Sequence, residues 1–502
     1  MALKDFFKRY IGDKAFYREM FFVAFPIALQ QLISASVNIV DSAMIGRWGN
    51  LAFGPGGSEV SSAAVMIAGR YMTTFENIMI LLAISCTIFI AQYFGARNKE
   101  AMRKVFGLCM KLTIGFGLGA LILGFFFRQE IVLFFSTGVG SGMEMLTLGR
   151  SYLAIVAWTF IPYSLSVALS FCLRAIKKTK IPLLSSGAAA IFNLVMNYIL
   201  IYPLGMGVIG AAIATLLARF VELGILVYYY FRHKPEFYGP FAEVFEIPRA
   251  FAVNILRKGW PMVIAQALTE GLAMFMFFAY SRVELGNATN IAAINLSTRV
   301  VELIFAFVGG MGTAAAIMVG SRLGAGKIEE AKRNARWQIS YILMMSMATV
   351  LIMIGLIPVI QILFSYDVAG NQLLAVAMVL QALALPFLFY SSNVIFITRA
   401  GGYTKAPIFI TNIPYILIKA PLVSLFVFVY PGVIENSPWL QTTFAALGLP
   451  VNLVIFVFII DRFIEVVRAI IAYIVYHRAD WQKDITRQTS RSLKKKPEIA
   501  TT

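Results

Sequence analysis

The sequence has few charged residues, few histidines and few cysteines for its 502 residues. Asp, Glu, Lys and Arg make up 14% of the chain, whereas soluble domains average about 25%. A soluble globular protein of ordinary composition is therefore excluded. A disordered chain is excluded as well, because 59% of the residues are hydrophobic and the mean hydropathy is +0.78. These values indicate an integral membrane protein.

Several chemical motifs are missing. The three cysteines, Cys86, Cys109 and Cys172, lie in apolar segments, and His233 and His477 lie in polar ones. This pattern predicts neither a disulfide framework nor a zinc site, so we expect buried, small cysteine side chains. No G-x4-G-K-[ST] loop occurs, and ATP hydrolysis is not expected. The N-terminus is charged from its fourth residue, so we expect the first apolar run to be retained and not cleaved as a signal peptide.

Twelve apolar runs can each form a membrane-spanning helix, since about 20 residues cross roughly 30 Å of hydrocarbon. The runs are long and continuously apolar, which disfavours a β-barrel, whose strands alternate over about ten residues. We therefore predict an all-α integral membrane protein. The expected helices cover 17–45, 61–94, 101–127, 146–173, 181–202, 208–231, 257–281, 290–321, 332–357, 372–398, 407–430 and 445–476.

The net charge of +18 is distributed unevenly among the loops. Lys and Arg gather in alternate loops, whereas the loops between them carry only Arg47, Arg128 and Arg282. The loop between the fourth and fifth helices, for example, contains Arg174, Lys177, Lys178 and Lys180. This alternation follows the positive-inside rule and predicts cytoplasmic termini. The basic charge thus indicates membrane orientation and not nucleic-acid binding.

The chain repeats itself, with six expected helices in each half. Pro26, Gln31 and Arg47 match Pro261, Gln266 and Arg282; Gly95 and Ala96 match Gly324 and Ala325; and Arg174, Thr179, Lys180 and Pro182 match Arg399, Thr404, Lys405 and Pro407. We expect two six-helix bundles, related by a pseudo-two-fold axis along the membrane normal, with a polar cleft between them. The domains are a cytoplasmic N-terminal segment 1–16, the bundles 17–231 and 257–476, a cytoplasmic connecting loop 232–256 and a basic tail 477–502.

Asp41 is the clearest ionisable residue inside a predicted span. A charge at the bilayer centre costs about 2.5–3.5 kcal/mol, so such a residue is a functional candidate, although a structural hydrogen-bond acceptor is the alternative. Helical spacing places Gln31, Ser34, Asn38 and Asp41 on one face. Asn193 and Asn197, four residues apart, and Thr215 add oxygen atoms from two further helices. Such groups around one carboxylate suit a proton or a hard monovalent cation.

The motifs together resemble the multidrug and toxic compound extrusion (MATE) transporters, over about residues 17–476. The similarity lies in P-x4-Q followed by Asp fifteen residues after the proline, the AQYFGA and GSRLGAG helix ends, the RAIKKTKIP loop and the N-x3-N-Y-x-L-I-Y-P-L-G-x-G-V-x-G-A-A-x-A-T stretch. With a carboxylate in its first helix, the sequence resembles the DinF-like prokaryotic branch of this family in particular. The resemblance implies a cation site, with Na⁺ as the candidate metal, at Asp41, Asn193, Asn197 and Thr215. Asn197 stands where the family usually has Asp.

Further residues are candidates for lining the cleft. Pro26 can kink the first helix because it removes one backbone hydrogen bond. The other candidate cleft-lining residues of the first half are Gln31, Ser34 and Asn38. Those of the second half are Gln266, Glu270 and Lys419. We expect the second half to have diverged, with the ammonium of Lys419 paired to Glu270, Asp461 or Glu465.

The sequence therefore predicts a secondary active multidrug efflux transporter and not an enzyme. It would export lipophilic or cationic organic compounds by alternating access, in exchange for H⁺ or Na⁺ and without another cofactor. We expect a multi-pass monomer in the inner (plasma) membrane, with the bilayer and small organic substrates as its partners. The alternatives are a lipid-linked oligosaccharide or lipid flippase of the same superfamily, a membrane-embedded enzyme and a channel. A flippase usually has more helices and a more cationic cleft, an enzyme would show Asp or His motifs at helix ends, and a channel would show a selectivity filter.

Overall fold

The structure is a computed structural model that describes residues 10–54, 57–136, 143–283, 288–364, 368–434, 436–446 and 453–486. Of the described residues, 89% are helical and none lies in a strand. In the same ranges, ten helices are long and apolar enough to cross a membrane, judged by length and composition. Two further long helices follow the remaining predicted spans, 257–281 and 445–476. The prediction of an all-α membrane fold is confirmed.

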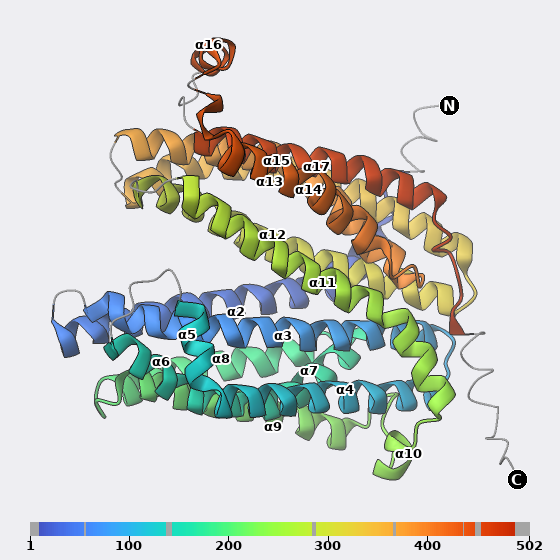
Figure 1. Ribbon diagram of the computed structural model, residues 1–502. Helices are drawn as coiled ribbons and strands as arrows, with labels where there is room; N and C mark the ends of the chain where they lie inside the picture. The colour runs from blue at the N-terminus through green and yellow to red at the C-terminus, as the bar shows by residue number, and fades with distance from the viewer. Residues whose placement is uncertain are drawn as a thin grey trace, which may run out of the picture. The chain divides into compact units, whose positions relative to one another are not determined.

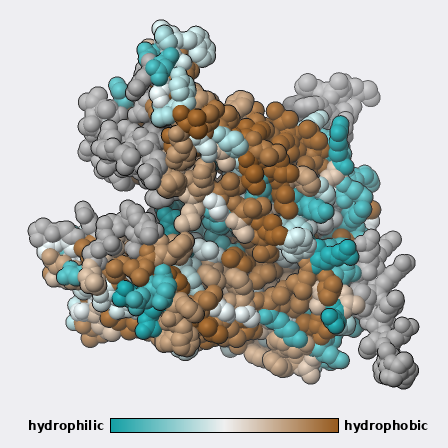
Figure 2. Space-filling model, viewed as in Figure 1, coloured by the Kyte–Doolittle hydropathy of each residue, from teal (hydrophilic) through white to brown (hydrophobic). Residues whose placement is uncertain are grey.

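The chain divides into two compact units. The N-terminal unit comprises Phe21–Trp260, Gly320–Gly326 and Asp484–Thr502, and the C-terminal unit comprises Met1–Met20, Pro261–Val319 and Lys327–Lys483. Exposed apolar side chains such as Leu351, Ile362 and Leu417 fit a lipid environment, since each is more than two-thirds exposed. Figure 2 shows broad hydrophobic areas on the visible face, with many of the hydrophilic residues toward its margins.

The helices that mainly build the N-terminal unit are coloured blue to green in Figure 1. They are α2 (Lys14–Phe53), α3 (Gly57–Gly95), α4 (Lys99–Phe126), α5 (Arg128–Ser136), α6 (Met143–Val156), η1 (Ala157–Thr159), α7 (Phe160–Ala175), α8 (Lys180–Ile201), α9 (Gly207–His233) and α10 (Phe241–Phe245).

The predicted fourth helix, 146–173, is interrupted. It consists of α6 and α7 joined by the 3₁₀ turn η1. Pro162 has no N–H to donate to the carbonyl of Trp158, and the Thr159 hydroxyl instead donates to the carbonyl of Val156 at 2.7 Å. The backbone hydrogen bond that Pro162 cannot make explains why the chain tightens into the 3₁₀ turn η1.

Most helices of the C-terminal unit run from yellow-green to red in Figure 1. They are α11 (Arg249–Val283), α12 (Ala288–Gly324), α13 (Ile328–Phe364), α14 (Val368–Ala400), η2 (Ile408–Asn412), η3 (Tyr415–Lys419), α15 (Ala420–Ser424), η4 (Leu425–Val429), η5 (Pro431–Val433), α16 (Pro438–Ala446) and α17 (Leu453–Arg478).

The predicted span 407–430 is present as Ile408–Val429. It alternates π-helical and α-helical segments, because Pro407, Pro414 and Pro421 each remove a backbone donor and force wider turns. One predicted span of this unit needs correction. The last span begins at Leu453 and not at residue 445, since residues 445 and 446 belong to α16. The intervening Gly448 and Pro450, which lie outside the described residues, are helix breakers.

The internal repeat has a structural counterpart at the helix ends. At the end of α7 the Arg174 guanidinium lies 4.5 Å from the Phe171 ring centre, and at the end of α14 Arg399 lies 4.0 Å from the Phe396 ring centre. Three residues after each arginine comes a left-handed residue, Lys177 (φ 64°) or Gly402 (φ 90°). Both halves thus end their fourth predicted span in the same way.

The AQYFGA and GSRLGAG motifs bring two backbones together within the N-terminal unit. A Cβ atom on Gly95 of α3 would lie 1.8 Å from the carbonyl oxygen of Ser321, and one on Gly324 of α12 would lie 1.9 Å from that of Gln92. Only glycine permits this approach. The contact explains why Gly320–Gly326 belongs to the N-terminal unit.

Candidate functional site

Asp41 joins two asparagines inside the N-terminal unit. The side-chain amide of Asn197 donates to Oδ1 of Asp41 at 2.6 Å and to Oδ1 of Asn193 at 3.1 Å. Asn197 is fully buried, Asn193 is nearly so, and Asp41 is half-buried. The Asn197 carbonyl oxygen has no hydrogen-bond partner in the described part of the chain. A carboxylate and two amide groups, from α2 and α8, therefore form one polar group.

Thr215 lies on α9, which packs against both α8 and α6. Of the four residues that the family resemblance implied, Asp41, Asn193 and Asn197 are joined by hydrogen bonds, and Thr215 lies on a helix next to α8.

The other candidates on α2 are less closely grouped. Pro26 is buried within the helix, and Gln31 is half-buried. Ser34 is exposed, and its hydroxyl donates to the carbonyl of Gln30 at 3.0 Å. The side chain of Asn38 lies outside the described part of the structure.

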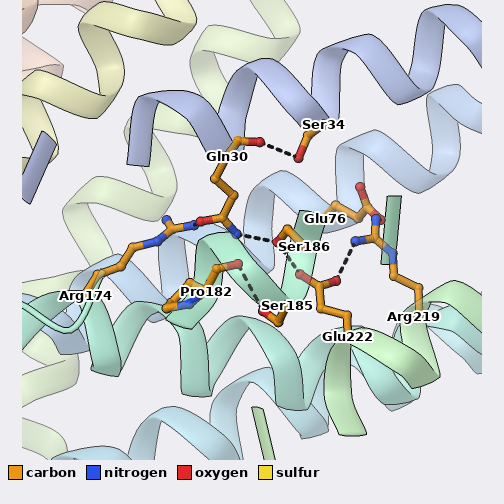
Figure 3. Close-up of polar contacts among 9 residues, drawn as sticks. All are labelled: Gln30, Ser34, Glu76, Arg174, Pro182, Ser185, Ser186, Arg219 and Glu222. Atoms are coloured by element: carbon orange, nitrogen blue, oxygen red, sulfur yellow. Dashed lines mark hydrogen bonds and ion pairs between the residues drawn. The ribbon is translucent and has the colours of Figure 1, made fainter. Parts of the chain in front are cut away.

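A second polar network crosses the N-terminal unit (Figure 3). It begins at Arg174 on α7, which donates to Oε1 of Gln30 on α2 at 2.6 Å. The Gln30 amide donates to the hydroxyl of Ser186 on α8 at 2.6 Å, and that hydroxyl donates to Oε1 of Glu222 on α9 at 2.7 Å. Arg174 is 7% exposed, so it is a buried residue and not a loop cation as the sequence suggested.

The network continues to α3 through Arg219. This guanidinium lies 3.3 Å from Oε2 of Glu222 and 3.0 Å from Oε1 of Glu76, and its centre is 4.4 Å from the Tyr163 ring centre. The network therefore contains two guanidinium groups and two carboxylates. Figure 3 shows Glu76 of α3 turned toward Arg219 and Glu222, which both lie on α9.

The C-terminal unit holds a different arrangement. Lys419 forms an ion pair with Asp461 of α17, and its ammonium lies 4.3 Å from the Tyr415 ring centre. Of the three carboxylates considered for Lys419, the structure gives Asp461, which also pairs with Arg462. Lys419 and Asp461 are both buried. Both charges of this buried pair are therefore compensated.

Two other carboxylates of this unit were candidates. Glu465 accepts from Arg468 at 2.6 Å and from the Tyr415 hydroxyl at 3.0 Å. Glu270 of α11 accepts from the Gln266 amide at 2.8 Å. Glu465 is thus held by a cation of its own helix, whereas Glu270 accepts from an uncharged donor.

A repeated motif could have pointed to these clusters. The sequence Arg-Phe-x-Glu occurs at 219–222 and again at 462–465. The arginine of the first copy pairs with its own glutamate, whereas Arg462 pairs with Asp461 and Glu465 pairs with Arg468. The same motif is therefore used in two ways.

Charged and amide side chains buried in the membrane-spanning helices mark functional positions, and transporters are one class of membrane protein that carries them. The MatE family model matches residues 26–199 and 261–425, and the chain belongs to this family. The two matched stretches correspond to the two halves of the internal repeat.

Named relatives cover most of the chain. It is 26% identical over 421 residues to the probable multidrug resistance protein NorM of Pasteurella multocida (strain Pm70), covering 81% of this chain and 85% of that protein. It is also 26% identical over 457 residues to multidrug and toxin extrusion protein 1 of Xenopus tropicalis, covering 88% of this chain and 74% of that protein.

Solved structures share the fold. The crystal structure of a MATE in the straight conformation superposes with a TM-score of 0.77 at 19% identity, covering 97% of this chain and 98% of that chain. At this identity the likeness concerns the fold, and it confirms the prediction of a twelve-span fold of two six-helix bundles. The assignment to the DinF-like branch stays a prediction.

Proposed function

We propose that the protein is a secondary active multidrug efflux transporter that exchanges lipophilic or cationic organic compounds for H⁺ or Na⁺ at Asp41. Membership of the MatE family and the names of the relatives support export of organic compounds. The work is translocation across the membrane and needs no catalytic residue. The coupling to an ion rests on this chain's own residues.

The observation that carries the proposal is the uncharged partner of Asp41. Glu76 and Glu222 lie against Arg219, Asp461 lies against Lys419, and Glu465 lies against Arg468. Asp41 instead accepts from the amide of Asn197. A carboxylate inside a membrane without a cation beside it is stabilised by binding one. Glu270 also accepts from an amide, that of Gln266, but only Asp41 of these two is bonded to a side chain whose buried carbonyl oxygen has no partner in the described part of the chain. Asp41 is therefore the group best placed to take up and release a coupling ion.

The donor set supports a proton or a monovalent hard cation. The Asn197 carbonyl oxygen is buried and has no partner among the described residues, and the Asp41 carboxylate is in contact with the amide nitrogen of the same side chain. Carboxylate and amide oxygens are ligands for hard cations. In the described part of the chain, no group of three or more His, Cys, Asp or Glu could hold a metal ion. The proposal therefore concerns a proton or a hard monovalent cation and not a transition metal.

Ion binding at Asp41 would couple two helices. Asp41 belongs to α2 and its amide partner to α8, so a cation between them changes a contact that joins the two helices. Pro26 lies inside α2 and weakens its backbone ladder by one hydrogen bond. Loading and unloading the carboxylate would thus bias the position of α2 during alternating access.

The setting follows from the same proposal. A multi-pass monomer in the inner (plasma) membrane, with both termini in the cytoplasm, agrees with the apolar spans and with the basic loops. In that orientation the coupling ion enters the cell while the organic compound leaves it.

The test is drug efflux from cells that express Asp41→Asn. This variant keeps the shape and the hydrogen-bonding capacity of the side chain but removes its charge, so efflux should fall to the level of cells without the transporter. Glu130→Gln is the matched control, because Glu130 is an exposed carboxylate on the short helix α5. Wild-type efflux by Asp41→Asn at wild-type abundance would reject coupling at Asp41.

A further inference from the structure

Helix α2 is bonded to α8 by two side-chain contacts inside the N-terminal unit. The Gln30 amide donates to the Ser186 hydroxyl at 2.6 Å, and the Asn197 amide donates to Asp41, also at 2.6 Å. Both pairs of partners are 156 residues apart in the chain. The two helices therefore run parallel and in register between these contacts.

The two contacts lie on the same face of each helix. The distance from residue 30 to 41 on α2 equals that from 186 to 197 on α8, which is 11 residues. Eleven residues make about three turns and span about 16 Å. Side chains three whole turns apart point in the same direction, so a slide or a rotation of α2 that breaks one contact displaces the other as well.

The contact between Gln30 and Ser186 is held from both ends (Figure 3). The Arg174 guanidinium can only donate, so it fixes Oε1 of Gln30 toward itself and leaves the amide nitrogen for Ser186. The Ser186 hydroxyl in turn donates to Glu222 of α9 at 2.7 Å. Gln30 is 6% exposed. None of these bonds involves Asp41, so the contact does not depend on an ion there.

We propose that Gln30 and Ser186 are positioning residues for ion coupling. Their contact sets the register of α2 on α8, and this register brings Asp41 to Asn197. The inference rests on the proposed function, in which Asp41 takes up and releases the coupling ion. An ion at Asp41 weakens its charge-assisted bond from Asn197. The contact at Gln30 stays, so α2 moves about Gln30 as a fixed point and returns to the same register when the ion leaves.

The test compares Ser186→Ala with Ser185→Ala in proteoliposomes that hold the full chain. Ser185 is the matched control, because its hydroxyl donates to the carbonyl of Pro182 within α8 itself, at 3.0 Å. Substrate accumulation is measured over a series of pH gradients and, separately, of Na⁺ gradients. The readouts are the half-saturating concentration of the ion and the maximal rate.

Ser186→Ala should shift the half-saturating concentration about three- to tenfold, which corresponds to one hydrogen bond, and should leave the maximal rate nearly unchanged. The shift should be toward lower concentration for H⁺, with which the Asn197 N–H competes. It should be toward higher concentration for Na⁺, which the Asn197 carbonyl oxygen would bind. Ser185→Ala should behave like the wild type.

Three further variants separate positioning from a general loss of structure. Ser186→Thr keeps the hydroxyl and should restore the wild-type value. Gln30→Met keeps the length of the side chain, and it should show the same shift even where Ser186→Ala does not fold. Ser186→Ala combined with Asn197→Ala should shift no further than Asn197→Ala alone, because both act through one contact.

Equal half-saturating concentrations in Ser186→Ala and Ser185→Ala, or additive shifts in the double variant, would overturn the positioning role. Such a result would leave the proposed function standing as long as Asp41→Asn loses gradient-driven accumulation. Wild-type accumulation by Asp41→Asn would reject the proposed function itself, so the two failures are distinguishable.

Discussion

Asp41 and Arg219 show how differently single charges are treated within one unit. Asp41 has an amide as its partner, whereas Arg219 lies between two carboxylates and over an aromatic ring. A group that must bind and release an ion cannot have a permanent counter-ion. A charged group that holds three helices together needs a permanent counter-ion. The first arrangement fits an exchangeable site, and the second fits a structural junction.

Removing Arg219 should destabilise the protein much more than removing an equivalent exposed arginine. Arg219→Leu leaves Glu76 and Glu222 side by side without their cation, which should cost about 3 kcal/mol after discounting for the partial exposure of the guanidinium. Arg299→Leu is the matched control, because Arg299 and Glu302 form the same i, i+3 pair with side chains that are 72% and 56% exposed. It should cost less than about 1 kcal/mol. Thermal unfolding in detergent measures both, and equal losses would contradict the assignment.

At the residue scale, the sequence grouped some side chains that the structure brings into contact and did not find others, and the role of Asp41 in ion coupling stays a prediction. Helical spacing identified Asp41, and the family motif identified Asn193 and Asn197, which lie in contact with it. The same spacing favoured Gln31, but the structure buries Gln30 in the network instead. Two adjacent glutamines differ by only 100° around a helix, so periodicity alone could not choose between them.

At the scale of elements, α10 illustrates how a short helix is fixed to a long one. A Cβ atom on Gly107 of α4 would lie 1.8 Å from the carbonyl oxygen of Val244, so the two backbones are in direct contact. The ammonium groups of Lys104 and Lys111 donate to the carbonyls of Glu246 and Phe245 at 2.6 and 2.7 Å. These lysines satisfy carbonyl groups that a helix end otherwise leaves open.

Gly107→Ala should release α10 from α4. The added methyl group has no space, so the helices must separate, and we expect a loss of about 1–3 kcal/mol. Limited proteolysis should then cut more rapidly around α10. Gly115→Ala on the same helix is the matched control, because nothing lies within 4 Å of its added Cβ and alanine is the better helix former. If both variants resist protease like the wild type, the close approach is not what holds α10.

The elements themselves were largely predictable, because long apolar runs with basic ends specify membrane helices with little ambiguity. Departures from a regular α-helix inside these spans occur at prolines. Pro162 falls near the middle of a run that hydropathy reads as one helix, and Pro407, Pro414 and Pro421 fall in another. Hydropathy averages over such residues, whereas the backbone responds to each missing N–H. The polar junctions between helices were not predictable, because they depend on which faces pack together.

At the scale of the whole molecule, coupling to one ion sets a limit on what the transporter can accumulate. A step of one pH unit supplies about 1.4 kcal/mol per proton, which holds an organic compound at about a tenfold gradient. A membrane potential of about 100 mV adds about 2.3 kcal/mol per charge moved, or about fiftyfold. For a monovalent organic cation exchanged against one proton, no net charge moves and this contribution cancels.

Voltage should therefore act differently on two classes of substrate. With one proton or sodium ion per substrate, an imposed potential of about 100 mV should raise the steady-state gradient of an uncharged compound by about fiftyfold and leave that of a monovalent cation unchanged. Proteoliposomes with a potassium diffusion potential measure both. An equal response of the two substrates would contradict one-for-one exchange.

The central claim, that Asp41 carries the coupling ion, is tested most directly by comparing two transport modes of Asp41→Asn in proteoliposomes. The first mode is accumulation driven by a pH or sodium gradient, and the second is exchange of labelled for unlabelled substrate without any gradient. The account predicts that the variant loses the first mode and keeps the second, because the path for substrate remains while the ion site is lost. Accumulation equal to that of the wild type would contradict the account.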